Sequence, residues 1–338
     1  MIVTSSLTGG GAERSMNLLT NELLRRGWEI SLVPINSSDP DLIEPKSKVF
    51  FLNRKWSSGL IGTMRSVVKF NRITFKWKPE IVILNCALPE LLGSMMLTSA
   101  SIIVLEHAKL PWVGREYLGR TVRRILKFRR AKWVAVSSHL RIWPSTNSPQ
   151  SILQNSISNL KIQNIDVNTP TPLKRLVFIG RLSAEKRPDW LLEISSKSGF
   201  PAIFIGDGIL RSWLEDKLMS SNPLVSFQGY VRNPWKLLIP GDLLIVPSEW
   251  EGDGLVVIEA IQANIPILLS DIPDFRRFLF PDHNYADDCA AFVRSIELNS
   301  RDLNSLRIPQ EISSKILYER TPVKVGNDWD RFLRTFDE

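Results

Sequence analysis

The chain has 338 residues, about twice the length of a common domain, and its 43% hydrophobic content is enough to form two separate cores. Its two cysteines, Cys86 and Cys289, lie far apart and outside any Cys/His pattern, so neither a disulfide framework nor a zinc site is indicated, and a reducing cytoplasm fits. The N-terminus lacks the features of a signal peptide, and no apolar run reaches the roughly 18 to 20 residues that span a bilayer. We therefore expect a soluble or peripheral protein.

The net charge of +8 is unevenly distributed along the chain. Residues 1–160 contain 22 Lys and Arg against 10 Asp and Glu, whereas the remaining residues contain 21 against 25. An anionic partner is therefore expected at the N-terminal half. Nucleic acid, a membrane surface and a phosphate-bearing substrate all fit this charge.

Apolar runs bounded by turn residues alternate with segments of helical period, a pattern typical of parallel βαβ units. In the first half, strands are expected at 28–34, 80–85, 101–106 and 132–137, and helices at 13–26 and 89–99. In the second half, strands are expected at 174–179, 201–205, 225–228, 242–246 and 265–269, and helices at 187–198, 210–220 and 256–264. A polar, Pro-rich segment at 156–172 is interpreted as a linker. It separates domains at 1–155 and 173–310, and a terminal helix at 311–338 is expected to return to the first domain.

The first motif is Gly9-Gly10-Gly11-Ala12-Glu13-Arg14, between a short strand and a helix. Because glycine has no Cβ, Gly10 and Gly11 would let backbone N–H groups at the helix N-terminus approach an anion closely. The alternative is a simple tight turn. The spacing is not GxGxxG, which disfavours an ordinary dinucleotide site.

The second motif is a strand that ends at Gly180 and is followed by Arg181 and Lys186. Both cations are expected in the crevice beyond the carboxyl ends of a parallel sheet, where such folds bind ligands. A guanidinium fork together with a point charge suits a diphosphate. Two solvated loop cations are the alternative.

The third motif places Glu251 and Glu259 eight residues apart, around the start of a helix. One carboxylate would lie at the mouth of the helix and the other in its first turns. The pair could hold hydroxyl groups of a ligand whose anionic part faces the helix N-terminus. The alternative is a solvated pair of acids.

Together with Gly206-Asp207-Gly208 and Phe227-Gln228-Gly229-Tyr230, these motifs resemble the GT-B glycosyltransferases of family 4, in order and spacing over nearly the whole chain. The resemblance implies an α/β protein with two Rossmann-like domains that face a central cleft, and a retaining transfer in bacterial surface-polysaccharide synthesis. It implies that Arg181 and Lys186 neutralise the donor diphosphate. Glu259 would bind the ribose hydroxyls, and Glu251 would bind those of the transferred sugar.

The same resemblance assigns roles to further residues. His107, at the end of a predicted strand, would contact the donor sugar, although a structural role is the alternative for a lone histidine. Gly10 and Gly11 would close on the phosphate from the first domain. The remaining residues expected to bind the donor are Gly180, Gly206, Asp207, Tyr230, Gly252, Asp253, Gly254 and Leu255.

Two positions depart from the family pattern. Asp253 would add a negative charge near the donor sugar, which would favour a sugar with a hydroxyl or amino substituent unless the side chain turns outward. Asn155-Ser156 replaces a common Asn-Gly at the start of the linker, so the geometry of the hinge is expected to differ.

No metal or other cofactor is expected. Two Asp-x-Asp elements, Asp39-Pro-Asp41 and Asp328-Trp-Asp330, are poorly placed for a metal at the end of a strand. Arg181 and Lys186 can supply the positive charge instead. We therefore expect a metal-independent reaction.

Two basic stretches carry most of the N-terminal charge: residues 54–78, with seven cations among aromatic and aliphatic residues, and residues 120–132, also with seven. The second, with Val122, Ile125, Leu126 and Phe128, is interpreted as a surface helix that binds an anionic membrane or the pyrophosphate of an acceptor. A helix packed on the core is the alternative. No nucleic-acid-binding motif accompanies the charge.

We therefore expect an enzyme that transfers a hexose or N-acetylhexosamine from a nucleotide-diphosphate sugar, with UDP as the expected nucleotide. The acceptor would be a lipid-diphosphate-linked glycan of an O-antigen, lipopolysaccharide or capsule, at the inner face of the cytoplasmic membrane. The alternatives are a sugar-nucleotide epimerase of the same fold and a non-catalytic partner subunit.

Overall fold

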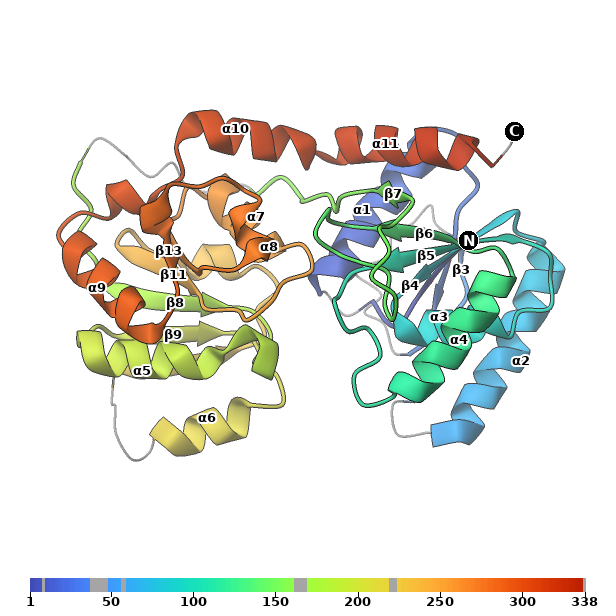
Figure 1. Ribbon diagram of the computed structural model, residues 1–338, viewed down its shortest axis with the longest axis horizontal. Helices are drawn as coiled ribbons and strands as arrows, with labels where there is room; N and C mark the ends of the chain where they lie inside the picture. The colour runs from blue at the N-terminus through green and yellow to red at the C-terminus, as the bar shows by residue number, and fades with distance from the viewer. Residues whose placement is uncertain (8–9, 37–47, 56–58, 161–168, 219–223, 337–338) are drawn as a thin grey trace. The chain divides into compact units, whose positions relative to one another are not determined.

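The structure, a computed structural model, describes residues 1–7, 10–36, 48–55, 59–160, 169–218 and 224–336 (Figure 1). Gly9, the Asp39–Asp41 element and part of the predicted linker lie outside these ranges. The chain divides into two compact units: Met1–Ser158 together with Arg320–Glu338, and Asn159–Glu319. Among the described residues, no helix is both long and apolar enough to cross a bilayer.

The first unit contains a parallel sheet with the strand order β3-β2-β1-β4-β5-β6-β7. Its central strands are apolar runs buried on both faces, as parallel strands covered by helices require. In register, Val3 of β1 lies opposite Val33 of β2 and Leu84 of β4. The strands are β1 Ile2–Thr4, β2 Ser31–Pro34, β3 Lys48–Val49, β4 Ile81–Asn85, β5 Ser101–Glu106, β6 Lys132–Ala135 and β7 Ser151–Ile152.

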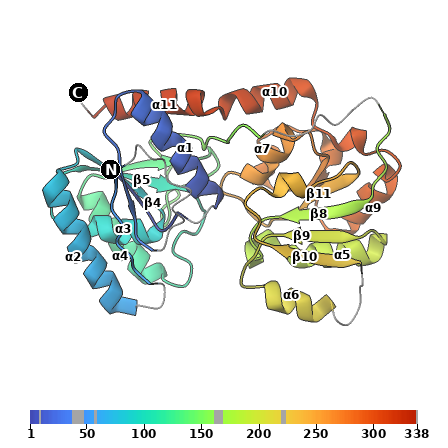
Figure 2. The same ribbon diagram turned by 180° about the vertical axis from the view of Figure 1, so that it is seen from behind.

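Helices cover both faces of this sheet (Figures 1 and 2). On one face, α1 (Gly11–Arg25) and α11 (Pro322–Arg334) bury side chains such as Leu19 and Trp329. On the other face, α2 (Gly59–Trp77), α3 (Ala87–Ser94) and α4 (Glu116–Phe128) bury Phe70, Leu92 and Leu126. Because side chains alternate along a strand, each strand contributes to both clusters.

The terminal segment forms two helices rather than the single helix that the sequence predicts. The first, α10 (Gln310–Glu319), packs against α7 (Leu255–Gln262) in the second unit. The second, α11, packs against α1, where Trp28 Nε1 donates to Asp330 at 2.7 Å and Arg26 donates to Asn327 at 2.7 Å. Gly326 allows this close approach, since a Cβ there would lie 2.8 Å from the side chain of Glu22.

The second unit contains a parallel sheet with the order β10-β9-β8-β11-β12-β13. Its strands are β8 Arg175–Ile179, β9 Ala202–Ile205, β10 Val225–Gly229, β11 Asp242–Val246, β12 Ile267–Ser270 and β13 Tyr285–Ala286. Its other helices are α5 Pro188–Ser198, α6 Arg211–Leu218, α8 Pro273–Arg276 and α9 Cys289–Asn299. The helices α5, α6 and α9 share one core, which includes Leu191, Leu214 and Phe292.

Both units are thus doubly wound α/β domains, so the predicted fold class of two Rossmann-like domains is confirmed. In each sheet the strand order reverses direction between the first strand and its neighbour: between β1 and β4, and between β8 and β11. In open sheets of this kind, ligands bind outside the carboxyl ends of the strands at this switch point.

Candidate functional site

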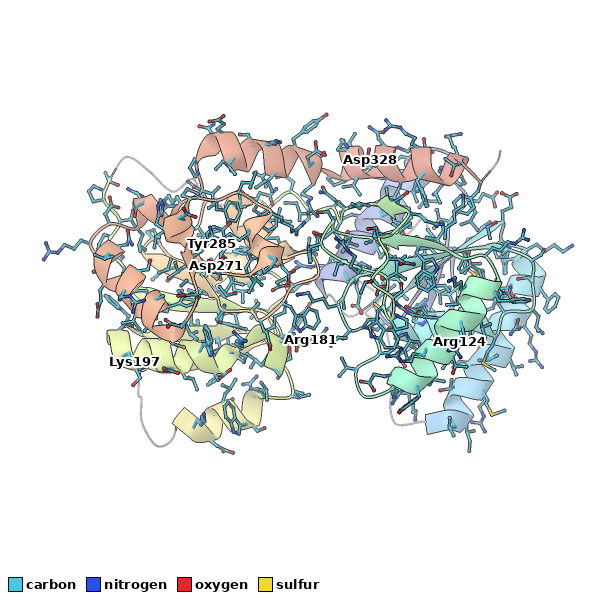
Figure 3. All side chains as sticks on the ribbon, viewed as in Figure 1. Arg124, Arg181, Lys197, Asp271, Tyr285 and Asp328 are labelled. Carbon is cyan, nitrogen blue, oxygen red and sulfur yellow. The ribbon has the colours of Figure 1, made fainter. Side chains whose placement is uncertain are left out.

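The residues of the second and third motifs come together at the switch point of the second domain. The loop that follows β8 carries Arg181 and Lys186, and the loop that follows β11 carries Glu251 and Asp253. The two loops are joined by a backbone hydrogen bond of 2.8 Å from the amide of Glu249 to the carbonyl of Glu185. Arg181 is labelled in Figure 3.

Glycines allow two loops at this edge to touch. The amide of Leu182 donates to the carbonyl of Asp207 at 2.9 Å, which ties the loop after β8 to the loop after β9. A Cβ at Gly206 would lie 1.9 Å from the carbonyl oxygen of Gly180, and one at Gly208 would lie 2.3 Å from that of Leu182. Real Cβ atoms do not approach backbone this closely, so both positions require glycine.

Lys186 and Glu251 form an ion pair, with 2.6 Å between Nζ and Oε1. Ser248 Oγ donates to the same carboxylate oxygen at 2.9 Å, and the Glu251 amide donates to Asp274 at 2.8 Å. The side chain of Glu251 is only 7% exposed, whereas that of Lys186 is 25% exposed. The carboxylate is therefore held rigidly, and the ammonium keeps access to solvent.

Arg181 is exposed and precedes Lys186 by five residues in the loop after β8. Among the residues that the structure describes, its guanidinium makes no ion pair or hydrogen bond, so all its donors can serve an anion. Two other predicted ligands, Asp207 and Tyr230, are also exposed. Asp207 faces Arg211 at 3.5 Å, a pair that the sequence analysis did not foresee.

Glu259 lies in the second turn of α7 and is almost fully buried. Its Oε2 atom accepts a hydrogen bond of 3.0 Å from Nε1 of the buried Trp235. The indole Nε1–H can only donate and an ionised carboxylate can only accept, so the two groups are matched and the indole orients the carboxylate. Sequence reasoning missed Trp235, and the only signal was its position after Asn233-Pro234, a turn.

Asp253 does not bring an uncompensated charge to the site. Its carboxylate is 4% exposed and pairs with Arg277 at 3.1 Å, and the same guanidinium donates to the Asp253 carbonyl at 2.6 Å. Arg277 therefore compensates the charge of Asp253, and the side chain does not turn outward to solvent. Gly254 is the N-cap residue of α7 and has a φ of 62°. Its neighbour Leu255 and the preceding Gly252 are half-buried.

The glycine motif of the first domain caps its own helix. Gly10 is exposed at the N-cap of α1, with Gly11 as the first helical residue. The carboxylate of Glu13 folds back over this end, where it accepts from the Gly10 amide at 3.3 Å and from Ser6 Oγ at 2.5 Å. A side-chain anion thus lies at the helix end that the sequence analysis reserved for a phosphate.

His107 directly follows β5 and is half-buried. The residue before it, Glu106, belongs to a buried cluster in which Arg123 of α4 donates to Glu106 at 2.7 Å and to Glu90 of α3 at 2.6 Å. Trp112 Nε1 also donates to Glu90, at 2.9 Å. The cluster fixes the end of β5 and hence the start of the segment that carries His107.

Two arginines of the second basic stretch, residues 120–132, do not serve as the surface cations that the sequence predicts. Arg123 is 3% exposed and Arg129 donates to the carbonyls of Met96 and Thr98, so both are structural residues rather than surface cations. Arg124 and Arg130 remain exposed.

Burial raises the pKa of Glu106 to about 7, against the opposing effect of Arg123. A carboxyl group with a raised pKa binds its proton more tightly in the folded state. Its contribution to stability is therefore complete below about pH 4.5 and is lost as the pH rises through about 7. We expect the contribution of Glu106 to the free energy of unfolding to fall over this window, by up to about 1.4 kcal/mol per pH unit. Urea unfolding of the wild type and of Glu106→Gln at several pH values tests this, since the free energy of unfolding of the wild type relative to the variant should fall as the pH rises.

The described residues contain no group of three or more His, Cys, Asp or Glu side chains suited to a metal. The acids of the Asp328-Trp-Asp330 element pair with residues of their own domain. Asp328 binds Lys324 at 2.6 Å, and Asp330 binds Trp28 and Arg334.

Comparisons with known proteins agree with this architecture. Residues 173–297 match the family described as "Glycosyl transferases group 1". The sulfoquinovosyl transferase of Arabidopsis thaliana is 27% identical over 215 residues, which cover 59% of this chain and 41% of that protein. The poly(ribitol-phosphate) alpha-N-acetylglucosaminyltransferase of Staphylococcus aureus is 31% identical over 151 residues, 39% of this chain and 30% of that protein. The chain thus matches less than half the length of either relative.

A solved structure of Anabaena HepE in complex with UDP and glucose superposes with a TM-score of 0.75, at 13% identity and with 98% of each chain covered. The fold of the chain is therefore GT-B. The family match, which contains Arg181, Lys186, Glu251 and Glu259, supports a group 1 glycosyltransferase domain at 173–297.

Proposed function

We propose that the chain is a retaining glycosyltransferase that moves a hexose or N-acetylhexosamine from a nucleotide-diphosphate sugar, with UDP as the nucleotide. The observation that carries the proposal is the Lys186–Glu251 pair, with the exposed Arg181 in the same loop as Lys186, at the switch point of a domain that matches glycosyl transferases. A relative named as an N-acetylglucosaminyltransferase and a neighbour that holds UDP and glucose support it.

In the proposed reaction, the bond between the anomeric carbon and the diphosphate oxygen breaks. A bond to an acceptor hydroxyl oxygen forms, and the hydroxyl proton is released. Negative charge builds on the departing diphosphate, where preorganised cations stabilise the transition state most effectively. An ammonium has three donors, so Lys186 can keep Glu251 and still offer two to phosphate oxygens. Arg181 adds a planar fork.

The proposal assigns the sugar end of the donor to Glu251, which Ser248 and Lys186 hold in place. It assigns the ribose hydroxyls to Glu259, whose carboxylate Trp235 orients. The positive charge of Lys186 and Arg181 takes the place of a metal ion, so the reaction is proposed to be metal-independent. From the first domain, Gly10, Gly11 and His107 would contact the donor.

The proposed acceptor is a lipid-diphosphate-linked glycan in bacterial surface-polysaccharide synthesis, used at the inner face of the cytoplasmic membrane. The excess of cations in residues 1–160 supports a phosphate-bearing acceptor. So does the phosphate polymer in the name of the staphylococcal relative.

A panel of UDP-, GDP- and ADP-sugars, each incubated with a lipid-diphosphate acceptor, tests the proposal by mass analysis of the products. We expect a glycosylated acceptor with one UDP-sugar, and unchanged yield in EDTA. Rearrangement or hydrolysis of the donor without an acceptor would replace the proposal with a sugar-nucleotide epimerase or hydrolase. No turnover and no nucleotide binding would favour a partner subunit, and activity lost in EDTA and restored by manganese would overturn the metal-independent reaction.

A further inference from the structure

Helix α2 packs Val67, Phe70 and Ile73 against the core but leaves most of its large apolar side chains exposed. Its buried residues include three polar ones, Ser66, Asn71 and Thr74, besides Phe70. These polar groups are satisfied locally; for example, Asn71 binds the carbonyl of Met95 at 3.1 Å and the amide of Leu97 at 2.8 Å. Large apolar residues face solvent instead: Leu60 (83% exposed), Ile61 (68%), Met64 (66%), Val68 (53%) and Phe75 (55%).

These five apolar residues form one stripe. At about 100° per residue they fall within an arc of about 100° on the helix surface. The next arc, of about 60°, contains only cations, all of them exposed: Arg65, Lys69, Arg72 and Lys76. An exposed apolar stripe beside a row of cations is the pattern of a helix that lies in a membrane interface.

Helix α4 repeats this arrangement on the same face of the sheet (Figure 1). Tyr117 and Phe128 are each 90% exposed and lie within about 20° of one another on the helix surface. Arg120, Arg124 and Lys127 are exposed along one side of them, with Arg124 labelled in Figure 3. The exposed Met95 and Leu97 follow α3, the helix between α2 and α4 in the chain.

We infer that α2 and α4 together form a docking surface for an anionic lipid bilayer, and that α2 supplies the larger apolar part. Called here the α2/α4 face, it consists of the exposed apolar and cationic residues named above. A second copy of the chain fits it less well, because symmetric pairing would bring the same rows of cations together. The inference extends the proposed function, since a lipid-linked acceptor lies at such a surface.

The inference is tested by sedimentation of the full chain with vesicles of phosphatidylglycerol and phosphatidylcholine, and with vesicles of phosphatidylcholine alone. We expect binding to the anionic vesicles that weakens as salt is added. Met64→Gln with Phe75→Gln should lower the partition coefficient at least tenfold, and Arg65→Glu with Arg72→Glu should do the same.

Matched controls come from exposed residues of the second domain. Leu298→Gln with Ile239→Gln, and Arg294→Glu with Arg301→Glu, should leave partitioning unchanged. Every substituted side chain is exposed, so the variants are expected to fold like the wild type. Thermal unfolding checks this. Equal partitioning of the α2 variants and wild type would overturn the inference, as would a dimer in solution that the Met64→Gln and Phe75→Gln changes dissociate.

Failure of the proposed function would look different. Vesicle binding needs neither donor nor acceptor, whereas transfer to a water-soluble acceptor analogue needs no vesicle. A wild-type chain that transfers the sugar but does not bind the anionic vesicles would reject only the docking surface. Binding without transfer would reject only the glycosyltransferase.

Discussion

Replacing Lys186 by Met is expected to lower kcat/KM for the donor sugar by about 10²- to 10³-fold, the usual effect of removing one preorganised donor to a developing negative charge. The change removes the ammonium that would face the diphosphate. It also leaves the carboxylate of Glu251, 7% exposed, without its ion-pair partner. Initial rates with the donor identified in the panel, at saturating acceptor, measure the effect.

The control for this variant is Lys197→Met on α5. Lys197 and Glu193 also form an ion pair, at 2.7 Å, but both side chains are about half exposed. Figure 3 shows Lys197 at the far end of the domain from Arg181. Exposed pairs contribute little, so activity should stay at the wild-type level. A Lys186→Met enzyme as active as the Lys197→Met enzyme would contradict the assignment of the diphosphate to Lys186.

Replacing Gly206 by Ala is expected to lower the free energy of unfolding more than the same change at the other glycines of this site. The new Cβ would lie 1.9 Å from the carbonyl oxygen of Gly180, which is backbone and cannot rotate away, and φ at this position is 149°. Overpacking and backbone strain each cost about 1–3 kcal/mol, so a loss of roughly 2–6 kcal/mol is expected. Urea unfolding measures it. Nucleotide affinity should fall as well, because the loops after β8 and β9 must separate.

Gly199→Ala separates the two causes. Gly199 also has a positive φ, 75°, but a Cβ there meets no atom within 4 Å. This variant therefore carries the strain without the clash, and its loss should stay near 1 kcal/mol. If Gly206→Ala is no less stable than Gly199→Ala, the two loops do not need to touch.

Much of the fold could be predicted from the sequence, because parallel strands buried on both faces are short continuous apolar runs. The strands at 101–106 and 242–246 were predicted with their observed bounds, and the motif loops were placed at strand ends. The short edge strands β3, β7 and β13 were missed, since two-residue strands leave no periodic signal. Helix α2 was treated only as a basic stretch, because its buried face is largely polar.

By itself, the sequence determined the two α/β domains and the residues at the carboxyl edge of the second sheet, since glycines and charges after apolar runs are local signals. Only the tertiary structure decided which side chains meet. Arg277 neutralises Asp253, and Trp235 orients Glu259, from positions 24 residues away in each case. It also decided that Arg123 is buried while the apolar stripe of α2 faces solvent. Helical period gives the angle between two faces, but not which of them the sheet covers.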